Sequence, residues 1–125
     1  MMSQTNPHTE YYLAKAREIY ERALEEHQKF YRARDEQRKN LNLVAFYVNL
    51  AMERATRELK NLAYVVHHWG GDVQQVLEWR EEIIMKNRKM MRQVLREYVA
   101  KVQSQLEPGS RIDLDFENAN RDVVQ

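Results

Sequence analysis

Histidine is a residue type that binds metal ions, and this chain has two adjacent histidines, His67 and His68. Neighbouring residues of a helix point about 100° apart, so two adjacent imidazoles chelate one ion poorly. His8 and His27 have no histidine four residues further on, and no Glu-x-x-His pair of the di-iron type occurs. The chain also lacks cysteine, which excludes disulfides and thiolate metal sites. We therefore expect no metal site.

Five basic residues late in the chain are the candidates for contacting a charged partner: Lys86, Arg88, Lys89, Arg92 and Arg96. No acidic residue lies between positions 83 and 96, and the helical phase places this basic strip opposite Ile84, Met91 and Tyr98. Such side chains contact the phosphates of a nucleic acid or the carboxylates of an acidic protein segment. A solvated helix face is the simplest interpretation, and the chain's own acidic C-terminal tail is an alternative ligand to nucleic acid.

No motif for catalysis accompanies the basic strip. The sequence contains no glycine-rich phosphate loop, no nucleophile motif and no pair of carboxylates in a plausible cleft. We predict that the protein is not an enzyme, needs no cofactor and has no evident small-molecule substrate. The formal net charge of +1 gives no overall field that would select nucleic acid or an anionic membrane.

The length of 125 residues and the composition favour a single globular domain. With 43% hydrophobic and 31% charged residues, the chain is too apolar for a disordered protein and too charged for a membrane protein. No stretch reaches the roughly 18 apolar residues that a membrane span needs. Residues 1–8 are polar and lack the features of a cleaved signal peptide. We expect a cytoplasmic protein, or one exported by a route that needs no such signal.

Helix-breaking residues are rare, since the chain has three glycines and two prolines. We predict an all-α fold in which three long helices form an antiparallel bundle over residues 9–106, after a polar segment at residues 1–8. The first helix should start near Asn6 or Thr9, with Asn6 capping and Pro7 in the first turn. A turn between about residues 34 and 42 should separate the first two helices; the alternative is one continuous helix of about 60 residues.

Apolar residues at steps of three and four predict which side of each helix is buried. The predicted buried residues are, in the first helix, Tyr12, Ala16, Ile19, Ala23, His27, Phe30 and Arg34, flanked by Tyr20, Leu24 and Tyr31; in the second, Val44, Val48, Ala51, Ala55, Leu59, Leu62 and Val66; and in the third, Leu77, Ile84, Met91 and Tyr98, widened by Val76, Ile83, Met90, Val94 and Val102.

Residues 41–52 are the most apolar segment of the chain, with Asn42 and Asn49 as its polar members. A helix that is apolar on every side is normally buried on every side, and one antiparallel neighbour cannot cover it. We expect two helices of the same chain, or a partner chain, to close over this segment. The residues predicted to contact a partner are Leu43, Phe46, Tyr47 and Leu50.

The C-terminal tail, residues 107–125, carries five acidic and two basic side chains. Within it, apolar residues alternate with acidic ones, a period of two that is typical of a strand. No second strand pattern occurs for it to pair with, so we predict an extended acidic tail. The simplest interpretation is a disordered or loosely packed tail, and the alternative is a docking segment that adds to the edge of a partner's sheet. The tail residues predicted to contact a partner are Ile112, Leu114 and Phe116.

The segment Trp69-Gly70-Gly71-Asp72 predicts a stop and a restart between the second and third helices. One glycine should supply the left-handed residue that ends the second helix, and Asp72 should cap the third, with Gln75 returning the bond of a capping box. This Trp-x-Gly turn between two helices resembles the WXG family of small secreted helical-hairpin proteins. The resemblance implies export as a dimer, with Trp69 contributing to recognition.

The resemblance covers this turn and its flanking helices. The region before the turn is longer than one hairpin arm, and the family's Tyr-x-x-x-acidic segment is missing, because Tyr98 is followed four residues later by Val102.

Together these patterns predict a non-catalytic helical interaction protein, an adaptor, small chaperone or assembly subunit, that acts through its apolar second helix, Trp69 and the C-terminal tail. Its partner would be another protein or a second copy of the chain. The alternative is a nucleic-acid-binding accessory protein that uses the basic strip, although nucleic acid is the less favoured partner. A component of a secretion apparatus or of a virion is a further alternative.

Overall fold

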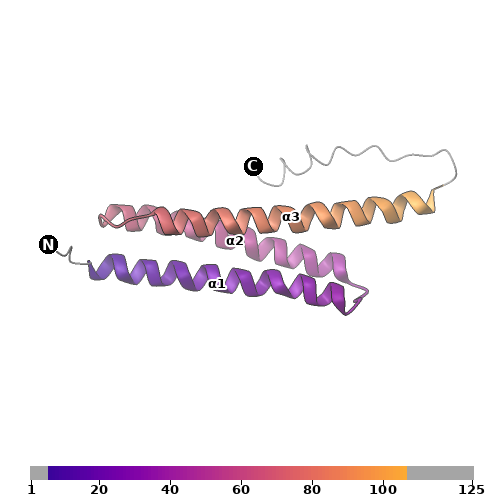
Figure 1. Ribbon diagram of the computed structural model, residues 1–125, viewed down its shortest axis with the longest axis horizontal. Coiled ribbons are helices and arrows are strands. Elements are labelled where there is room, and N and C mark those ends of the chain that lie inside the picture. Colours follow the sequence, from indigo (N-terminus) through magenta and orange to yellow (C-terminus); the bar gives the residue numbers. More distant parts are fainter. Residues whose placement is uncertain (1–5, 107–125) are drawn as a thin grey trace.

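The computed structural model describes residues 6–106, which form three long helices packed against one another (Figure 1). Helix α1 spans Pro7–Asp35, α2 spans Leu41–His68 and α3 spans Gln74–Gln105. Consecutive helices run in opposite directions, so α1 and α3 are parallel to each other (Figure 1). The predicted all-α three-helix bundle is confirmed. The C-terminal tail, residues 107–125, lies outside the described residues.

Helix α1 begins and ends at polar residues that satisfy its free backbone groups. The backbone amide of His8 donates to the side-chain oxygen of Asn6 over 2.8 Å, and Pro7 occupies the first turn, as predicted. At the other end the amide of Glu36 donates to the carbonyl of Arg32, and Gln37 adopts a φ of 54°. A left-handed residue of this kind costs about 1–2 kcal/mol and reverses the chain. One continuous helix through the first two is therefore excluded.

The second turn is built from the two glycines. Gly70 has a φ of 77°, the left-handed conformation predicted for the end of α2, and the amide of Gly71 donates to the carbonyl of Val66 over 2.9 Å. A Cβ on Gly71 would collide with the side chains of Thr9 and Val66, so only glycine lets this turn approach the start of α1.

Asp72 caps the start of α3, because its side chain accepts from the amide of Gln74 over 2.9 Å. The structure shows no returning bond from Gln75 among the described residues. The side chain of Gln74 instead donates to Glu78, over 3.1 Å. Asp72 therefore acts as a simple cap, and among the described residues the predicted capping box with Gln75 does not form.

The core consists of large side chains from all three helices, separated by alanines that let the backbones approach. Small residues shorten the distance between packed helices, and larger ones fill the remaining space. The largest fully buried side chains are Phe30 of α1, Met52, Leu59 and Val66 of α2, and Val76, Ile83 and Met90 of α3; the buried alanines are Ala16, Ala23, Ala33, Ala45, Ala55 and Ala63.

On α3 the row predicted to widen the buried side is the fully buried one, and the row predicted as its centre is not. Val76, Ile83 and Met90 are fully buried, whereas Leu77 and Tyr98 are 46% and 53% exposed. Two adjacent rows of apolar residues repeat every seven positions on this helix, and the sequence does not show which row faces the other helices. One residue corresponds to a rotation of about 100°, so the basic strip lies opposite the row of Ile83 rather than the row of Ile84.

Helix α2 shows a smaller shift of the same kind. The predicted residues Val48, Ala55, Leu59 and Val66 are buried, as are Ala45, Met52 and Ala63. The predicted Val44, Ala51 and Leu62 are only half-buried. The buried sector is displaced because α2 contacts both α1 and α3, which lie on neighbouring sides of it.

Polar contacts join α1 directly to α3. The hydroxyl of Tyr20 donates to Glu82 over 2.6 Å, and its ring stacks on Trp79 with 5.3 Å between ring centroids. This hydrogen bond to a carboxylate, with burial second, raises the pKa of Tyr20 to about 12. Further along, Arg34 pairs with Glu97 at 2.8 Å. These contacts set the register of the two parallel helices.

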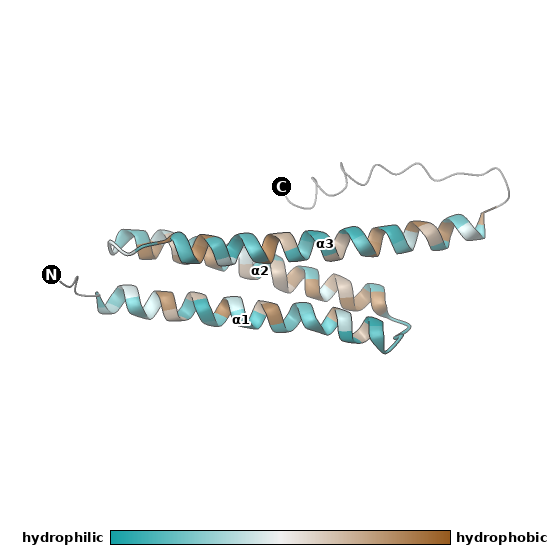
Figure 2. Ribbon diagram, in the orientation of Figure 1, coloured by the Kyte–Doolittle hydropathy of each residue, from teal (hydrophilic) through white to brown (hydrophobic). Residues whose placement is uncertain are grey.

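The first turns of α2 keep apolar residues on the side away from the bundle. Figure 2 shows hydrophobic colour on this part of α2, next to the turn that follows α1, and α3 extends beyond that turn (Figure 1). The prediction that residues 41–52 are buried on every side is wrong for the single chain. Leu43, Phe46, Tyr47 and Leu50 are between 43% and 60% exposed, because two neighbours cover only one sector of a helix.

Two leucines of α2 test this assignment of core and surface. Leu59 is fully buried and Leu50 is 43% exposed. We expect Leu59→Ala to lower the free energy of unfolding by about 2–4 kcal/mol because it leaves a cavity. The matched change Leu50→Ala should lower the free energy of unfolding by less than about 1 kcal/mol. Urea unfolding followed by circular dichroism measures both, and equal losses would contradict the buried sector described here.

Candidate partner-binding surfaces

Four large apolar residues are exposed close together on α2, and we term them the α2 face: Leu43, Phe46, Tyr47 and Leu50. Their spacing of three, one and three residues puts them on one side of two helical turns. The rings of Phe46 and Tyr47 meet edge to face, with 5.6 Å between centroids. The structure thus brings together the four residues that the sequence predicts for partner contact and leaves them accessible to solvent.

Beneath the α2 face, a polar pair crosses from α2 to α3. The side-chain nitrogen of Asn87 donates to the side-chain oxygen of Asn49 over 2.8 Å, and Asn49 donates in turn to Glu53 over 3.4 Å. Asn87 is buried between Ile83 and Met90 in the row that faces the core. The Oδ1 atom of Asn87 is buried and has no hydrogen-bond partner, so the pair is only partly satisfied. Its one bond between the helices requires one alignment and can favour that register of α3 against α2. Sequence reasoning noted Asn49 but missed Asn87, whose signal was a lone amide within an apolar row.

The basic strip lies on the opposite side of α3 from the core. Lys89 and Arg96 are exposed, whereas Lys86, Arg88 and Arg92 are half-buried. Together with Met85 and Gln93 the strip lines a hollow of about 710 Å³ along α3. No ion pair within residues 6–106 involves any of the five cationic side chains. The structure therefore gathers the predicted basic residues and leaves their charges unbalanced in the described part of the chain.

His27 of α1 lies behind one edge of the basic strip. It is 7% exposed and its ring meets that of Tyr31 edge to face. Burial lowers the pKa of His27, and the positive charges of Lys86 and Lys89 lower it further, while the backbone of Lys86 opposes them. His27 is therefore held in its neutral form by the fold.

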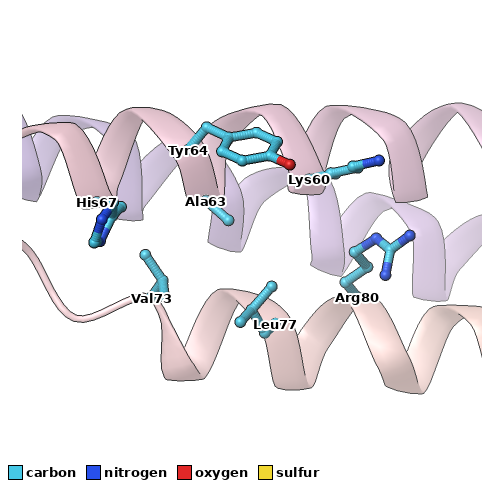
Figure 3. Close-up of a pocket in the computed structure, with 7 residues that line it drawn as sticks. All are labelled: Lys60, Ala63, Tyr64, His67, Val73, Leu77 and Arg80. Carbon is cyan, nitrogen blue, oxygen red and sulfur yellow. The ribbon is translucent and has the colours of Figure 1, made fainter.

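A third surface, which sequence reasoning missed, is a groove of about 420 Å³ between α2 and α3 (Figure 3). Val73, which directly precedes α3, and Leu77 of α3 extend toward Ala63 of α2, and these residues form its apolar wall (Figure 3). The remaining lining residues are Lys60, Tyr64, His67 and Arg80. Lys60, Tyr64 and His67 follow one another at steps of four and three, a helical spacing that would have identified one rim of the groove.

Trp69 closes the other end of the bundle. Its indole is 39% exposed and one side of it stacks on His8, with 4.1 Å between ring centroids. The stack joins the end of α2 to the start of α1 and occupies part of the surface that was predicted for a partner. Ile112, Leu114 and Phe116, the predicted contact residues of the C-terminal tail, lie outside the described residues.

No protein-family model matches this sequence, and no significant similarity was found to a curated protein or to a solved structure. The resemblance of the Trp69–Gly71 turn to the WXG family is therefore without support from a family match. Among residues 6–106, no group of histidine, aspartate and glutamate side chains is arranged to hold a metal ion. Within the same range, no helix combines the length and the apolarity needed to cross a membrane.

The environment of His27 predicts a pH dependence of stability. Because its pKa is lowered from 6.5 in the folded chain, the unfolded chain binds the proton more readily. The contribution of neutral His27 to the free energy of unfolding is fully present above about pH 6.5. It is lost as the pH falls below that value toward the pKa of the folded state. The urea concentration at the midpoint of unfolding, measured at pH 7.5, 6.5 and 5.5, should decrease with falling pH in wild type. It should decrease less in His27→Gln. Parallel losses in both proteins would show that other groups cause the decline.

Proposed function

We propose that the protein is a non-catalytic interaction protein that binds an apolar helix on the α2 face. The observation that supports this proposal is the helical alignment of four large apolar side chains, each at least 43% exposed on a helix whose opposite side is core. Scattered apolar residues are common on protein surfaces, but a contiguous patch at helical spacing is typical of a binding surface.

The energetics of the α2 face favour association. Fully burying a leucine or phenylalanine side chain contributes about 1.5–3 kcal/mol, so covering the exposed half of each contributes about 1 kcal/mol. The face lies on a helix packed against α1 and α3 rather than on a loop, so its side chains are held in place before a partner arrives. Rigid presentation reduces the entropy lost on binding.

Charges beside the α2 face indicate which helices would fit it. The same side of α2 continues through Arg54 and Arg57, both of which are exposed and belong to no ion pair within the described residues. A partner helix that presents apolar residues to the α2 face and acidic residues one or two turns further would be complementary along its length.

Two exposed tyrosines of α2 provide a matched test. Tyr47 belongs to the α2 face and is 60% exposed, whereas Tyr64 lies outside it and is 66% exposed. A photo-crosslinking amino acid at position 47 should give one dominant adduct in host extract, and Leu43→Ser with Leu50→Ser should abolish it. The same amino acid at position 64 should give no such adduct. Equal adducts from both positions, or none from position 47, would contradict the proposal.

The mass of the adduct distinguishes the two kinds of partner. A product of twice the chain mass of 15.1 kDa identifies a second copy of the protein and should be accompanied by a dimer in sedimentation equilibrium. A product of any other mass identifies a different protein, and the purified chain should then sediment as a monomer at micromolar concentration.

A second candidate function is binding of nucleic acid by the basic strip. The observation that favours it is the set of five cationic side chains that lack ion pairs within residues 6–106. In that case a DNA or RNA oligonucleotide should bind at 50 mM salt and be released at 200 mM, and Arg92→Ala with Arg96→Ala should weaken it. Arg54→Ala with Arg57→Ala is the matched control, and no binding of wild type at low salt would exclude the function.

A further inference from the structure

The basic strip of α3 carries more unsatisfied polar groups than a solvated helix face. The Nε atoms of Arg88 and Arg92 are buried from solvent and have no hydrogen-bond partner. One edge of each guanidinium group is therefore covered by protein, and Nη1 of Arg88 contacts Sδ of Met85 at 4.0 Å. Charged groups that are partly desolvated gain more from a carboxylate than fully hydrated ones do.

The hollow around the strip suits a ligand that is both apolar and acidic. Met85 and the aliphatic stems of the lysine and arginine side chains provide apolar surface within it, and the charged ends lie around that surface. A segment in which apolar and acidic side chains alternate presents both kinds of group at once. Such a segment exists in this chain at residues 112–117, where Ile, Leu and Phe alternate with two Asp and one Glu.

We propose that this acidic segment of the C-terminal tail binds the basic strip of the same molecule. Charge complementarity supports it, because residues 107–125 carry five acidic and two basic side chains while residues 83–96 carry five basic and no acidic ones. Length supports it as well. Residues 113–117 would span about 13 Å if extended, and Lys86 to Arg96 spans about 15 Å of helix.

The connection between strip and segment is long enough for this contact and short enough to favour it. From Leu106, the last described residue, Arg96 lies about 15 Å back along the helix and Lys86 about 30 Å back. The seven residues that lead to Asp113 reach up to about 23 Å, and the eleven that lead to Glu117 up to about 36 Å. Pro108 and Gly109 are residues of the type that reverses chain direction.

Tethering also favours the tail over an external polyanion. A ligand joined by a short linker has an effective concentration in the millimolar range, so it occupies the strip before a nucleic acid at micromolar concentration. An external acidic ligand would have to displace the tail first. The tail thus restricts the strip to ligands that bind more strongly than the tail itself. This inference concerns α3 and the tail and is independent of the α2 face.

The absence of cysteine allows a direct test in the full-length chain. A nitroxide attached at Asn118→Cys should broaden the backbone amide signals of residues 85–96 at 50 mM salt. Broadening should disappear at 500 mM salt and in the variant Asp113→Asn, Asp115→Asn, Glu117→Gln. The control Asp122→Asn removes one acidic charge outside the segment and should keep the broadening. Wild type without broadening, or equal broadening after neutralisation of the segment, would overturn the proposal.

Two further results distinguish binding of the tail within one molecule from binding of a second copy or of a nucleic acid. Broadening in wild type that is unchanged by tenfold dilution supports binding within one molecule, whereas broadening that disappears on dilution overturns it in favour of a second copy. A single-stranded oligonucleotide should bind the neutralised variant at least tenfold more tightly than wild type, because the tail no longer competes. Equal, strong binding to both proteins would show that the strip is a nucleic-acid site that the tail does not occupy.

Discussion

The structure depends on the way in which α2 packs against both of its neighbours. Alanines on α1 and α2 allow close approach of the backbones, and Met52, Leu59 and Val66 are fully buried on the side of α2 that faces its neighbours. This packing buries one sector of α2 and, by the same geometry, leaves the opposite sector outside. The apolar residues of the α2 face are exposed because α1 and α3 lie on neighbouring sides of α2 and leave its remaining side uncovered.

That constraint separates the two candidate surfaces of the protein. The α2 face lies on the outer side of one helix, and the basic strip lies on the outer side of another, each opposite a row of core residues. A hydrogen bond between buried Asn87 and half-buried Asn49 links α3 to α2, and the Tyr20–Glu82 contact at the surface links α1 to α3. Because these contacts fix the rotation of every helix, each surface is a property of the whole bundle and not of one helix.

Electrostatics distinguishes the two surfaces as clearly as hydrophobicity does. Some exposed cations of the bundle have carboxylate partners, as in the pair of Arg22 with Glu18, whereas others, such as Arg54 and Arg57, lack one within the described residues. The cations of the strip have none within residues 6–106, and their field reaches His27 in the core, where it helps to keep the imidazole neutral. A chain whose formal net charge is only +1 thus concentrates positive charge on α3 and negative charge in its tail.

The sequence by itself determined that the chain is helical, that its first helix starts near Asn6 and that a glycine pair separates α2 from α3, because capping residues, glycine and proline act over a few neighbouring positions. The structure decided for the turn between residues 34 and 42, since the sequence also allowed one continuous helix. The sequence also identified the α2 face and the basic strip as sets of residues. Tertiary structure decided which apolar row of α3 is core, that the α2 face stays exposed, and that Lys60, Tyr64 and Arg80 line a groove. These outcomes depend on how the helices rotate about their axes, and rotation is set by contacts between residues far apart in the chain.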